Sequence, residues 1–188
     1  MSSKISYIIG LDDAPFDRSH RGDVAVIGTI FNGARLEGIL RGKVRRDGAN
    51  ATGNLAEMIL GSRFAPSLQA VLLQGVTLAG FNVVDLPGLS ERVHLPVVSV
   101  CRKKPDLESI RRALLDSVPG GERKWRLIER LVPARKHREV YLHHINLEWQ
   151  DATALVDQFA TNSYLPEPIR TAHLIAGALA HGESRHRP

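Results

Sequence analysis

The chain has 188 residues, enough for one hydrophobic core, and we expect a single domain over residues 1–188. An apolar content of 43% excludes a disordered tail, and the single cysteine, Cys101, excludes an intrachain disulfide framework. The short N-terminal apolar stretch is broken by acids and does not resemble a signal peptide, and no apolar run approaches the ~20 residues of a membrane span. We therefore expect a soluble, cytoplasmic protein. The net charge of +5 permits binding to nucleic acid without requiring it.

The first part of the sequence predicts three antiparallel strands. Ile5 to Leu11 is apolar on both faces, as in a central strand, and Asp23 to Phe31 is a second apolar run. Asn32-Gly33 predicts a hairpin turn, because both turn positions favour positive φ. The third strand, Arg35 to Arg46, alternates between charged residues and small or apolar ones, which indicates one buried face.

The remainder predicts helices interleaved with strands. Helices are expected at 55–60, 106–117, 122–131, 151–161 and 167–181, and strands at 68–73, 95–101 and 140–147. Asn50 and Thr52 are candidate N-caps of the first helix. Alternation of this kind favours parallel pairing with right-handed crossovers. An antiparallel meander followed by such units is the order of the ribonuclease H-like α/β fold, a mixed sheet with flanking helices.

Polar side chains stand at the ends of two predicted strands. Asp12 and Asp13 follow the first strand, and Gln74 ends the fourth. If these strands are parallel neighbours, their ends lie at one edge of the sheet, where open α/β sheets bind ligands. A buried carboxylate costs desolvation free energy, and a cation such as Mg²⁺ or Mn²⁺ compensates for it. The other interpretation is that one of the two acids caps the following turn, because adjacent strand residues face opposite ways.

Several segments resemble the endonuclease dU family, which is similar to endonuclease V. They are Ile9 to Phe16, Arg46 to Thr52, Leu73 to Asp85, Pro96 to Val100 with Arg102 to Asp106, and Pro166 to His173. The resemblance covers nearly the whole chain, and Gly80-Phe81-Asn82 is its most specific part. It implies a ribonuclease H-like fold and a metal-dependent endonuclease that acts in DNA repair. The implied substrate is DNA, or RNA, with deaminated bases such as deoxyuridine.

The resemblance also implies roles for individual residues. The implied catalytic residues are Asp12 at the end of the first strand, Asp47 after the third, and Lys103 after the fifth. Gln74 stands where the family pattern has another acid, and a neutral amide weakens a two-metal site because it brings an oxygen without a charge. Asp85 would substitute if its loop folded back. The predicted metal ligands are Asp12, Asp13, Asp47, Gln74 and Asp85.

Basic residues follow two of the predicted strands, near the edge that holds Asp12. Cations at this position suit a phosphodiester substrate, although each basic run alone is typical of a solvated strand end. The loop at Gly80 could present backbone N–H groups to a phosphate, with Phe81 stacked on a base. Alternatively, Phe81 fills the core and Asn82 caps the next helix. The predicted nucleic-acid contacts are Arg45, Arg46, Gly80, Phe81, Asn82, Lys103 and Lys104.

Two further interpretations remain open. The departure at Gln74 supports a non-catalytic nucleic-acid-binding protein that retains the fold but has a degraded metal site. On the predicted last helix, Glu167, Arg170 and His173 lie within two turns of one another. This trio could contact a ligand, but its composition is more typical of an ordinary polar helix face.

Overall fold

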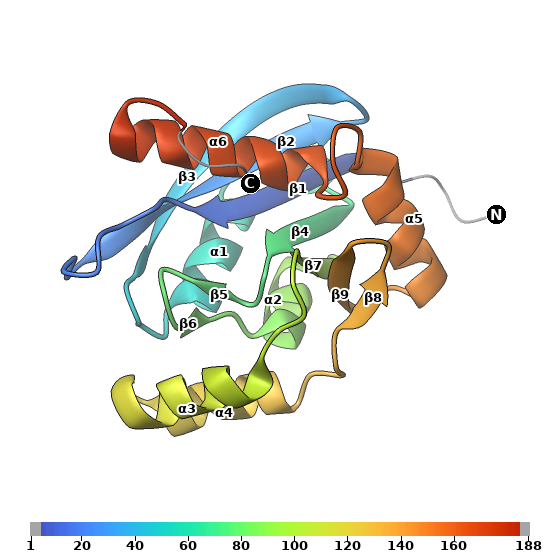
Figure 1. The fold of residues 1–188 in the computed structure, drawn as a ribbon. Coiled ribbons are helices and arrows are strands. Elements are labelled where there is room, and N and C mark those ends of the chain that lie inside the picture. The colour runs from blue at the N-terminus through green and yellow to red at the C-terminus, as the bar shows by residue number, and fades with distance from the viewer. Residues whose placement is uncertain (1–4, 185–188) are drawn as a thin grey trace.

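The computed structural model describes residues 5–184, which form a seven-stranded sheet between helices (Figure 1). The strand order is β3-β2-β1-β4-β7-β9-β8. The strands are β1 (Tyr7–Asp13), β2 (Asp23–Asn32), β3 (Arg35–Arg45), β4 (Ala70–Gln74), β7 (Val97–Cys101), β8 (Arg135–His137) and β9 (Val140–Ile145). A separate two-stranded ribbon contains β5 (Thr77–Leu78) and β6 (Asn82–Val83).

The pairing of the first five large strands confirms the predicted sheet. β1, β2 and β3 form an antiparallel meander, and the turn between β2 and β3 places Gly33 at a φ of 57°. β4 then pairs parallel to β1, with Leu11 beside Leu73. β7 continues the sheet parallel to β4. The carboxyl ends of β1, β4 and β7 therefore meet at one edge, as the ribonuclease H-like order requires.

The last part of the sheet differs from the expected parallel pairing. β9 runs antiparallel to β7, and β8, which the sequence pattern did not predict, pairs antiparallel with β9. The chain reaches β9 from β8 through a tight turn in which Arg138 has a φ of 50°. Because a hairpin reverses the chain whereas a crossover helix does not, this strand enters the sheet in the opposite direction.

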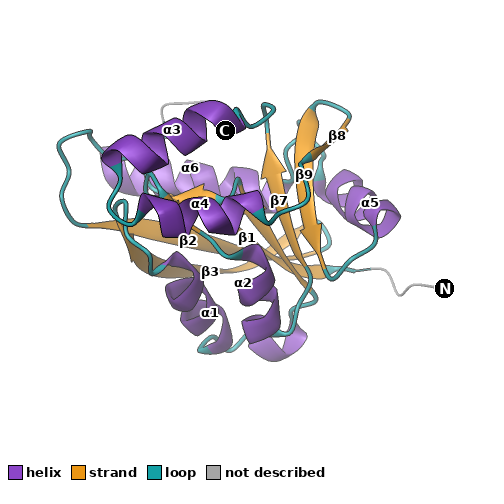
Figure 2. Cartoon of the chain, turned by 90° about the horizontal axis from the view of Figure 1, so that it is seen from below, coloured by secondary structure: helices purple, strands orange, loops and turns teal. Residues whose placement is uncertain are grey.

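Helices cover both faces of the sheet. In Figures 1 and 2, α5 and α6 lie against one face and α1 and α2 against the other, while the α3–α4 hairpin stands beside the β5–β6 ribbon. The helices are α1 (Ala51–Leu60), α2 (Leu86–Val93), α3 (Leu107–Ser117), α4 (Gly121–Glu129), α5 (Trp149–Phe159) and α6 (Glu167–His181), with a 3₁₀ turn (Ala65–Ser67). Within residues 5–184, none of these helices is long and apolar enough to cross a membrane.

The alternation of β1 divides its side chains between the two layers. Ile8 packs with the core beside α5 and the start of α6, and Ile9 packs with the core that includes α1 and α2. A Cβ at Gly10 would lie 2.4 Å from the carbonyl carbon of Pro168. The absence of a side chain at Gly10 therefore lets α6 approach the backbone of β1, which places the face of α6 next to the end of that strand.

Candidate active site at the ends of β1 and β4

The carboxylate of Asp12 lies on the α6 side of the sheet, where it contacts His173. Asp12 is 4% exposed, and its Oδ2 is 2.8 Å from Nδ1 of His173. Burial raises the pKa of Asp12, and the contact with His173 opposes that rise. The same hydrogen bond raises the pKa of His173. His173 is thus held as the partner of a buried acid rather than as part of an ordinary polar helix face.

Asp13 lies on the opposite side of the sheet and accepts a hydrogen bond from the backbone N–H of Ala79, at 2.9 Å. Burial, followed by the negative charge of Asp12, raises the pKa of Asp13 to about 7. β1 continues through both acids, so they face opposite ways, as strand geometry requires. The two carboxylates nevertheless remain close enough to repel each other at the end of one strand.

Gln74 stands beside Asp12 on the α6 side. The pairing of Leu11 with Leu73 brings Asp12 and Gln74 to the next position along β1 and β4, and parallel neighbours in register share a face. The Oε1 atom of Gln74 is buried and has no hydrogen-bond partner among the described residues. A buried amide oxygen without a donor costs free energy, which a cation bound to it would recover.

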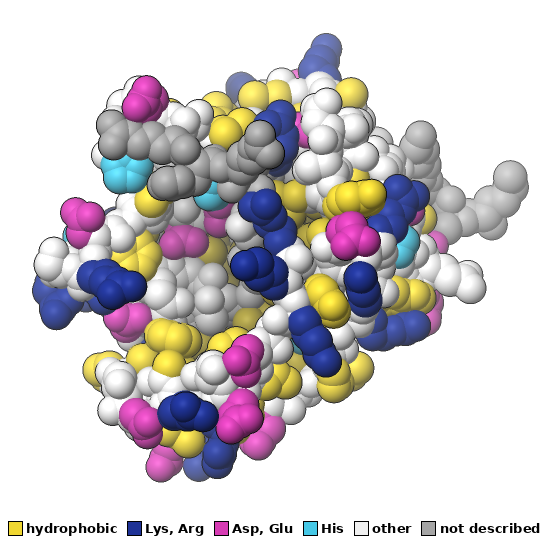
Figure 3. Space-filling model, viewed as in Figure 1, with side chains coloured by type: hydrophobic (Ala, Val, Ile, Leu, Met, Phe, Trp, Pro, Cys, Tyr) yellow, Lys and Arg dark blue, Asp and Glu magenta, His cyan; other side chains and the backbone are white. Residues whose placement is uncertain are grey.

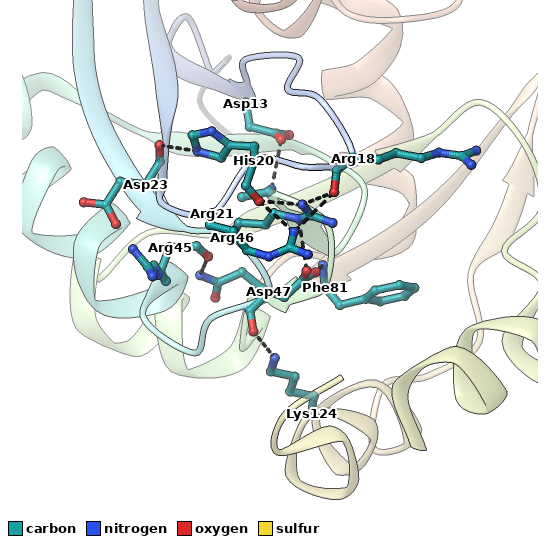
Figure 4. A network of polar contacts seen from close by, with 12 residues as sticks. Asp13, Arg18, His20, Arg21, Asp23, Arg45, Arg46, Asp47, Phe81 and Lys124 are labelled. Carbon is teal, nitrogen blue, oxygen red and sulfur yellow. Dashed lines mark hydrogen bonds and ion pairs between the residues drawn. The ribbon is translucent and has the colours of Figure 1, made fainter. Parts of the chain in front are cut away.

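Asp47 is linked to Asp13 through the turn between β5 and β6. Its carboxylate accepts the N–H of Phe81 at 2.9 Å and lies 3.2 Å from Nε of Arg46, an ion pair without hydrogen-bond alignment (Figure 4). Gly80 has a φ of 82°, and a Cβ there would lie 2.4 Å from Oδ1 of Asp47. Glycine is therefore required at position 80 both by the turn and by the approach of this carboxylate.

The five predicted metal ligands do not gather into one cluster. Within the described part of the chain, His, Cys, Asp and Glu side chains form no group of three or more that could hold a metal ion. Asp85 is an N-cap, because its carboxylate accepts the N–H of Gly88 at the start of α2, and it also pairs with Arg130. The loop of Asp85 does not fold back, so the structure gives this residue a structural position in place of the predicted metal-binding one.

Asn82 also has a structural position, although not the one expected. It is fully buried, its Oδ1 accepts the N–H of Ala51, and its amide nitrogen donates to Arg45 and Asn50. It therefore satisfies the first N–H of the preceding helix α1, whereas Asp85 caps the next helix. The side chain of Asn50 makes no cap bond to α1. A buried, fully bonded Asn82 cannot present its amide to a strand of nucleic acid at the surface.

The other predicted nucleic-acid contacts divide into a partly buried group and an exposed group. Phe81 packs with a small third core that includes Val83, Leu114 and Ile128, as the alternative interpretation expected. Arg46 donates to the carbonyls of Arg18 and His20, so its guanidinium fastens the loop after β1.

Arg45, Gly80, Lys103 and Lys104 are exposed. The hydrogen bond with Asp12 raises the pKa of His173, and among the cations that follow β7 Arg102 is the one whose charge opposes this rise, as a smaller effect. The pattern of the run gave no means of choosing between Arg102 and the two lysines.

One face of the molecule is hollowed where these groups meet. Figure 3 shows a recess between α6 and the α3–α4 hairpin, with acidic side chains in it and Lys and Arg side chains around its rim. Because Asp12 and Asp13 lie at the carboxyl end of β1, the recess is at the edge where open α/β sheets bind ligands. It combines a negative centre with a positive margin.

The sheet order is that of a ribonuclease H-like fold, with two acids at the end of its first strand. The chain belongs to the Endonuclease dU family, whose family model matches residues 4–180. A UPF0215 protein of Deinococcus radiodurans is 48% identical over 181 residues, covering 96% of this chain and 92% of its own length.

Two solved structures show the same fold. A protein of unknown function from Archaeoglobus fulgidus superposes with a TM-score of 0.88 at 31% identity, covering 94% of this chain and 99% of its own. Endonuclease V of Ciona intestinalis, solved with a 24mer DNA that contains an inosine, gives a TM-score of 0.58 at 14% identity, covering 91% and 84%. At that identity the second likeness concerns the fold alone.

Proposed function

We propose that this protein is a metal-dependent endonuclease for DNA, or RNA, that contains deaminated bases such as deoxyuridine. The observation that carries the proposal is the pair of adjacent carboxylates at the carboxyl end of β1, the buried Asp12 and the partly buried Asp13, both with raised pKa. Two repelling, desolvated acids are a costly arrangement, and a divalent cation removes that cost. Membership of the Endonuclease dU family supports the substrate class.

The residues present fit a hard cation such as Mg²⁺ or Mn²⁺. Asp12 offers a carboxylate on the α6 side of β1, and the buried Oε1 of Gln74 is an oxygen that lacks a donor. Asp13 adds negative charge directly beside them. Oxygen ligands of this kind are those that Mg²⁺ prefers. When bound, such an ion activates water and neutralises charge on a phosphoryl group.

The remaining roles belong to groups around the acids. His173 donates to Asp12 and fixes the orientation of its carboxylate. Arg102, with the exposed Lys103 and Lys104, supplies positive charge for the phosphates that flank the scissile bond. Asp47 fixes the turn that donates to Asp13 and thereby positions this second acid.

A nicking assay tests the proposal. Duplex and single-stranded substrates with uracil or hypoxanthine are incubated with the protein and Mg²⁺ or Mn²⁺. We expect Asp12→Asn to reduce the cleavage rate at least about 100-fold, because the main ligand loses its charge. Asp116→Asn, an exposed acid on α3, is the matched control and should cleave like the wild type. Wild type and Asp12→Asn that are equally inactive on every substrate and metal would contradict the proposal.

A specific observation favours a second candidate, a nucleic-acid-binding protein without catalysis. Gln74 brings no charge, and no third acid joins Asp12 and Asp13 within residues 5–184. This candidate predicts salt-dependent binding that is unaffected by Mg²⁺ and by Asp12→Asn. Gln74→Asp is informative under either candidate, because with a usable site geometry the variant should bind Mg²⁺ at least tenfold more tightly in calorimetry. Cleavage by the wild type that requires Mg²⁺, with Gln74 in place, separates the two.

A further inference from the structure

A cavity of about 600 Å³ lies between helices α1, α2 and α4, outside the acidic centre. Its wall contains the first turn of α1, the start of α2 and the start of α4. The N-terminal ends of three helices thus converge on one space. Each helix end carries about half a positive elementary charge. The carboxylate of Asp85 caps α2 and the side chain of Asn82 accepts the first N–H of α1, whereas α4, with Glu122 in its first turn, has no side-chain cap.

Three cationic side chains line the same cavity: Arg92, Arg123 and Lys124. Arg92 and Arg123 are exposed. The Nη1 atom of Arg92 would be 3.8 Å from a Cβ at Gly53, so this guanidinium lies over the first turn of α1. Arg92 belongs to the last turn of α2, and it places a positive group near the first turn of α1, an arrangement that an anion between them would stabilise.

Lys124 is the most costly of these cations. It is 3% exposed, its Nζ donates to the backbone carbonyl of Asp47 at 2.5 Å, and no ion pair within 4.0 Å joins it to an acid in the described part of the chain. Burial lowers the pKa of Lys124, and the charge of Asp47 only partly opposes this. Fully buried lysines without an ion pair are rare, because the loss of hydration is not repaid.

The acids near the cavity offset these charges only in part. Asp85 is already engaged by Arg130 and by the N-terminus of α2, which leaves Glu91 as the acid that lines the cavity without a described partner role. The surrounding sequence is also basic, since residues 102–138 contain twelve Lys or Arg against five Asp or Glu. The rest of the chain contains thirteen against fifteen. The positive charge of the protein is concentrated in the segment that includes the α3–α4 hairpin.

We propose that this cavity is a second binding site, which takes a phosphate group of the nucleic-acid strand at a distance from the bond that is cut. The inference rests on the proposed function for the identity of the strand. A direct chain of contacts joins the two sites: Lys124 holds the carbonyl of Asp47, whose carboxylate holds the β5–β6 turn, which in turn donates to Asp13 (Figure 4). A phosphate bound in the cavity would thus affect the position of Asp13 in the acidic centre, through Lys124 and Asp47.

The test follows backbone amides of the full chain by ¹⁵N NMR, in EDTA, so that no metal or cleavage is involved. Inorganic phosphate and a single-stranded oligonucleotide are the two probes. We expect both probes to shift the amides of Gly53 and Gly120, which lie at two of the helix ends. The double variant Arg92→Gln/Arg123→Gln should weaken both effects about tenfold. Its matched control, Arg112→Gln/Lys136→Gln, removes two exposed charges from the same basic segment and should change them less than twofold.

Each other outcome overturns the proposal. If phosphate shifts these amides and the oligonucleotide binds without shifting them, the cavity accepts a small phosphorylated ligand and not a strand. If neither probe shifts them, or if the two double variants lose affinity equally, only general electrostatic attraction remains. Lys124→Met, which removes the buried charge at nearly constant volume, should weaken phosphate binding as Arg92→Gln/Arg123→Gln does.

Failure of the phosphate site can be distinguished from failure of the nuclease proposal. Asp12→Asn should leave the amide shifts of Gly53 and Gly120 unchanged, because its effect is on metal-dependent cleavage. Normal nicking together with unshifted amides would contradict the phosphate site and leave the nuclease proposal standing. Shifted amides together with complete inactivity would contradict the nuclease proposal and leave the phosphate site standing.

Discussion

The acidic centre and the cationic cavity bury charge of opposite sign within a few contacts of each other. In the acidic centre, burial raises the pKa of Asp12 and Asp13, and in the cavity it lowers the pKa of Lys124. Both shifts favour the neutral form, so neither region is at its lowest free energy when charged and empty. The comparison shows two neighbouring regions in which burial disfavours the charged form of a side chain, one of them acidic and the other basic. A metal ion in the first and a phosphate of the strand in the second are the partners that we propose.

The largest expected effect comes from Gly121→Ala, which should disrupt the wall of the cavity at α4 and makes no contact with Asp12 or Asp13. A Cβ at position 121 would lie 1.8 Å from the carbonyl oxygen of Leu114, so α3 and α4 must separate. We expect a loss of about 3 kcal/mol in the free energy of unfolding, measured by urea titration. The Nδ1 contact between His173 and Asp12, followed by imidazole NMR, should persist.

Gly177→Ala is the control for that substitution, because its Cβ would meet its nearest atom, in Ser184, at an ordinary 3.6 Å. It should be neutral or slightly stabilising, since alanine favours the interior of α6. If Gly121→Ala also disrupted the His173–Asp12 contact, the two regions would not be separable, and the comparison would fail.

A smaller effect is expected at the acidic centre from Asp13→Asn, and it depends on pH. Because the folded state holds the pKa of Asp13 near 7, above its unfolded value, the folded protein binds the proton more tightly. Stability therefore falls as the pH rises from about 4 to about 7, and the variant lacks this fall. We expect Asp13→Asn to be more stable than wild type by on the order of 2 kcal/mol at pH 8, and equal to it at pH 4. Mg²⁺ should reduce the difference.

Thermal unfolding across this pH range, without metal, provides the measurement. The raised pKa of His173 adds stability that is present below its unfolded pKa and lost above its folded one, but it acts in both proteins and cancels in their difference. Asp116→Asn, at an exposed site, should reproduce the wild-type profile. If the stability of Asp13→Asn varied with pH in parallel with that of the wild type, the pKa of Asp13 would not be raised in the folded state.

The smallest expected effect on stability comes from Lys124→Met and concerns the cavity. Lys124→Met removes a desolvated charge but also loses the hydrogen bond to the carbonyl of Asp47. These opposing terms should leave the free energy of unfolding within about 1 kcal/mol of wild type. Weaker phosphate binding at unchanged stability would mark Lys124 as a residue retained for a ligand. A loss above about 3 kcal/mol in urea titration would mark it as structural.

The strands and helices were largely predictable because their patterns are local. Predicted and observed bounds of α6 agree. The alternation of β3 identified the face that is covered, although only in part, since glycines at 38 and 42 leave room for Phe64 and Met58 whereas Leu36 at the end of that face is exposed. The pattern missed β8 because three mostly exposed polar residues carry no apolar signal. It also missed the reversed direction of β9, which depends on a turn and not on the strand itself.

The candidate site was less predictable, because its contacts join distant parts of the chain. Asp12 and His173 are separated by 161 residues, and Lys124 and the carbonyl of Asp47 by 77. No spacing rule connects such pairs. Asn82 illustrates the opposite case, since its conspicuous polarity in a loop indicated a ligand contact, whereas the folded chain uses it to satisfy α1.

The sequence alone determined the family, the pairing of β1, β2, β3, β4 and β7, and the presence of acids at the end of β1, because motifs and apolar periodicity are carried by consecutive residues. The tertiary structure decided which acids are buried together, that His173 is the partner of Asp12, that Asp85 is a cap, and that three helix ends meet Lys124 at one cavity. The physical reason is that desolvation and charge pairing depend on neighbours in space, and the packing of α4 and α6 against the sheet sets those neighbours.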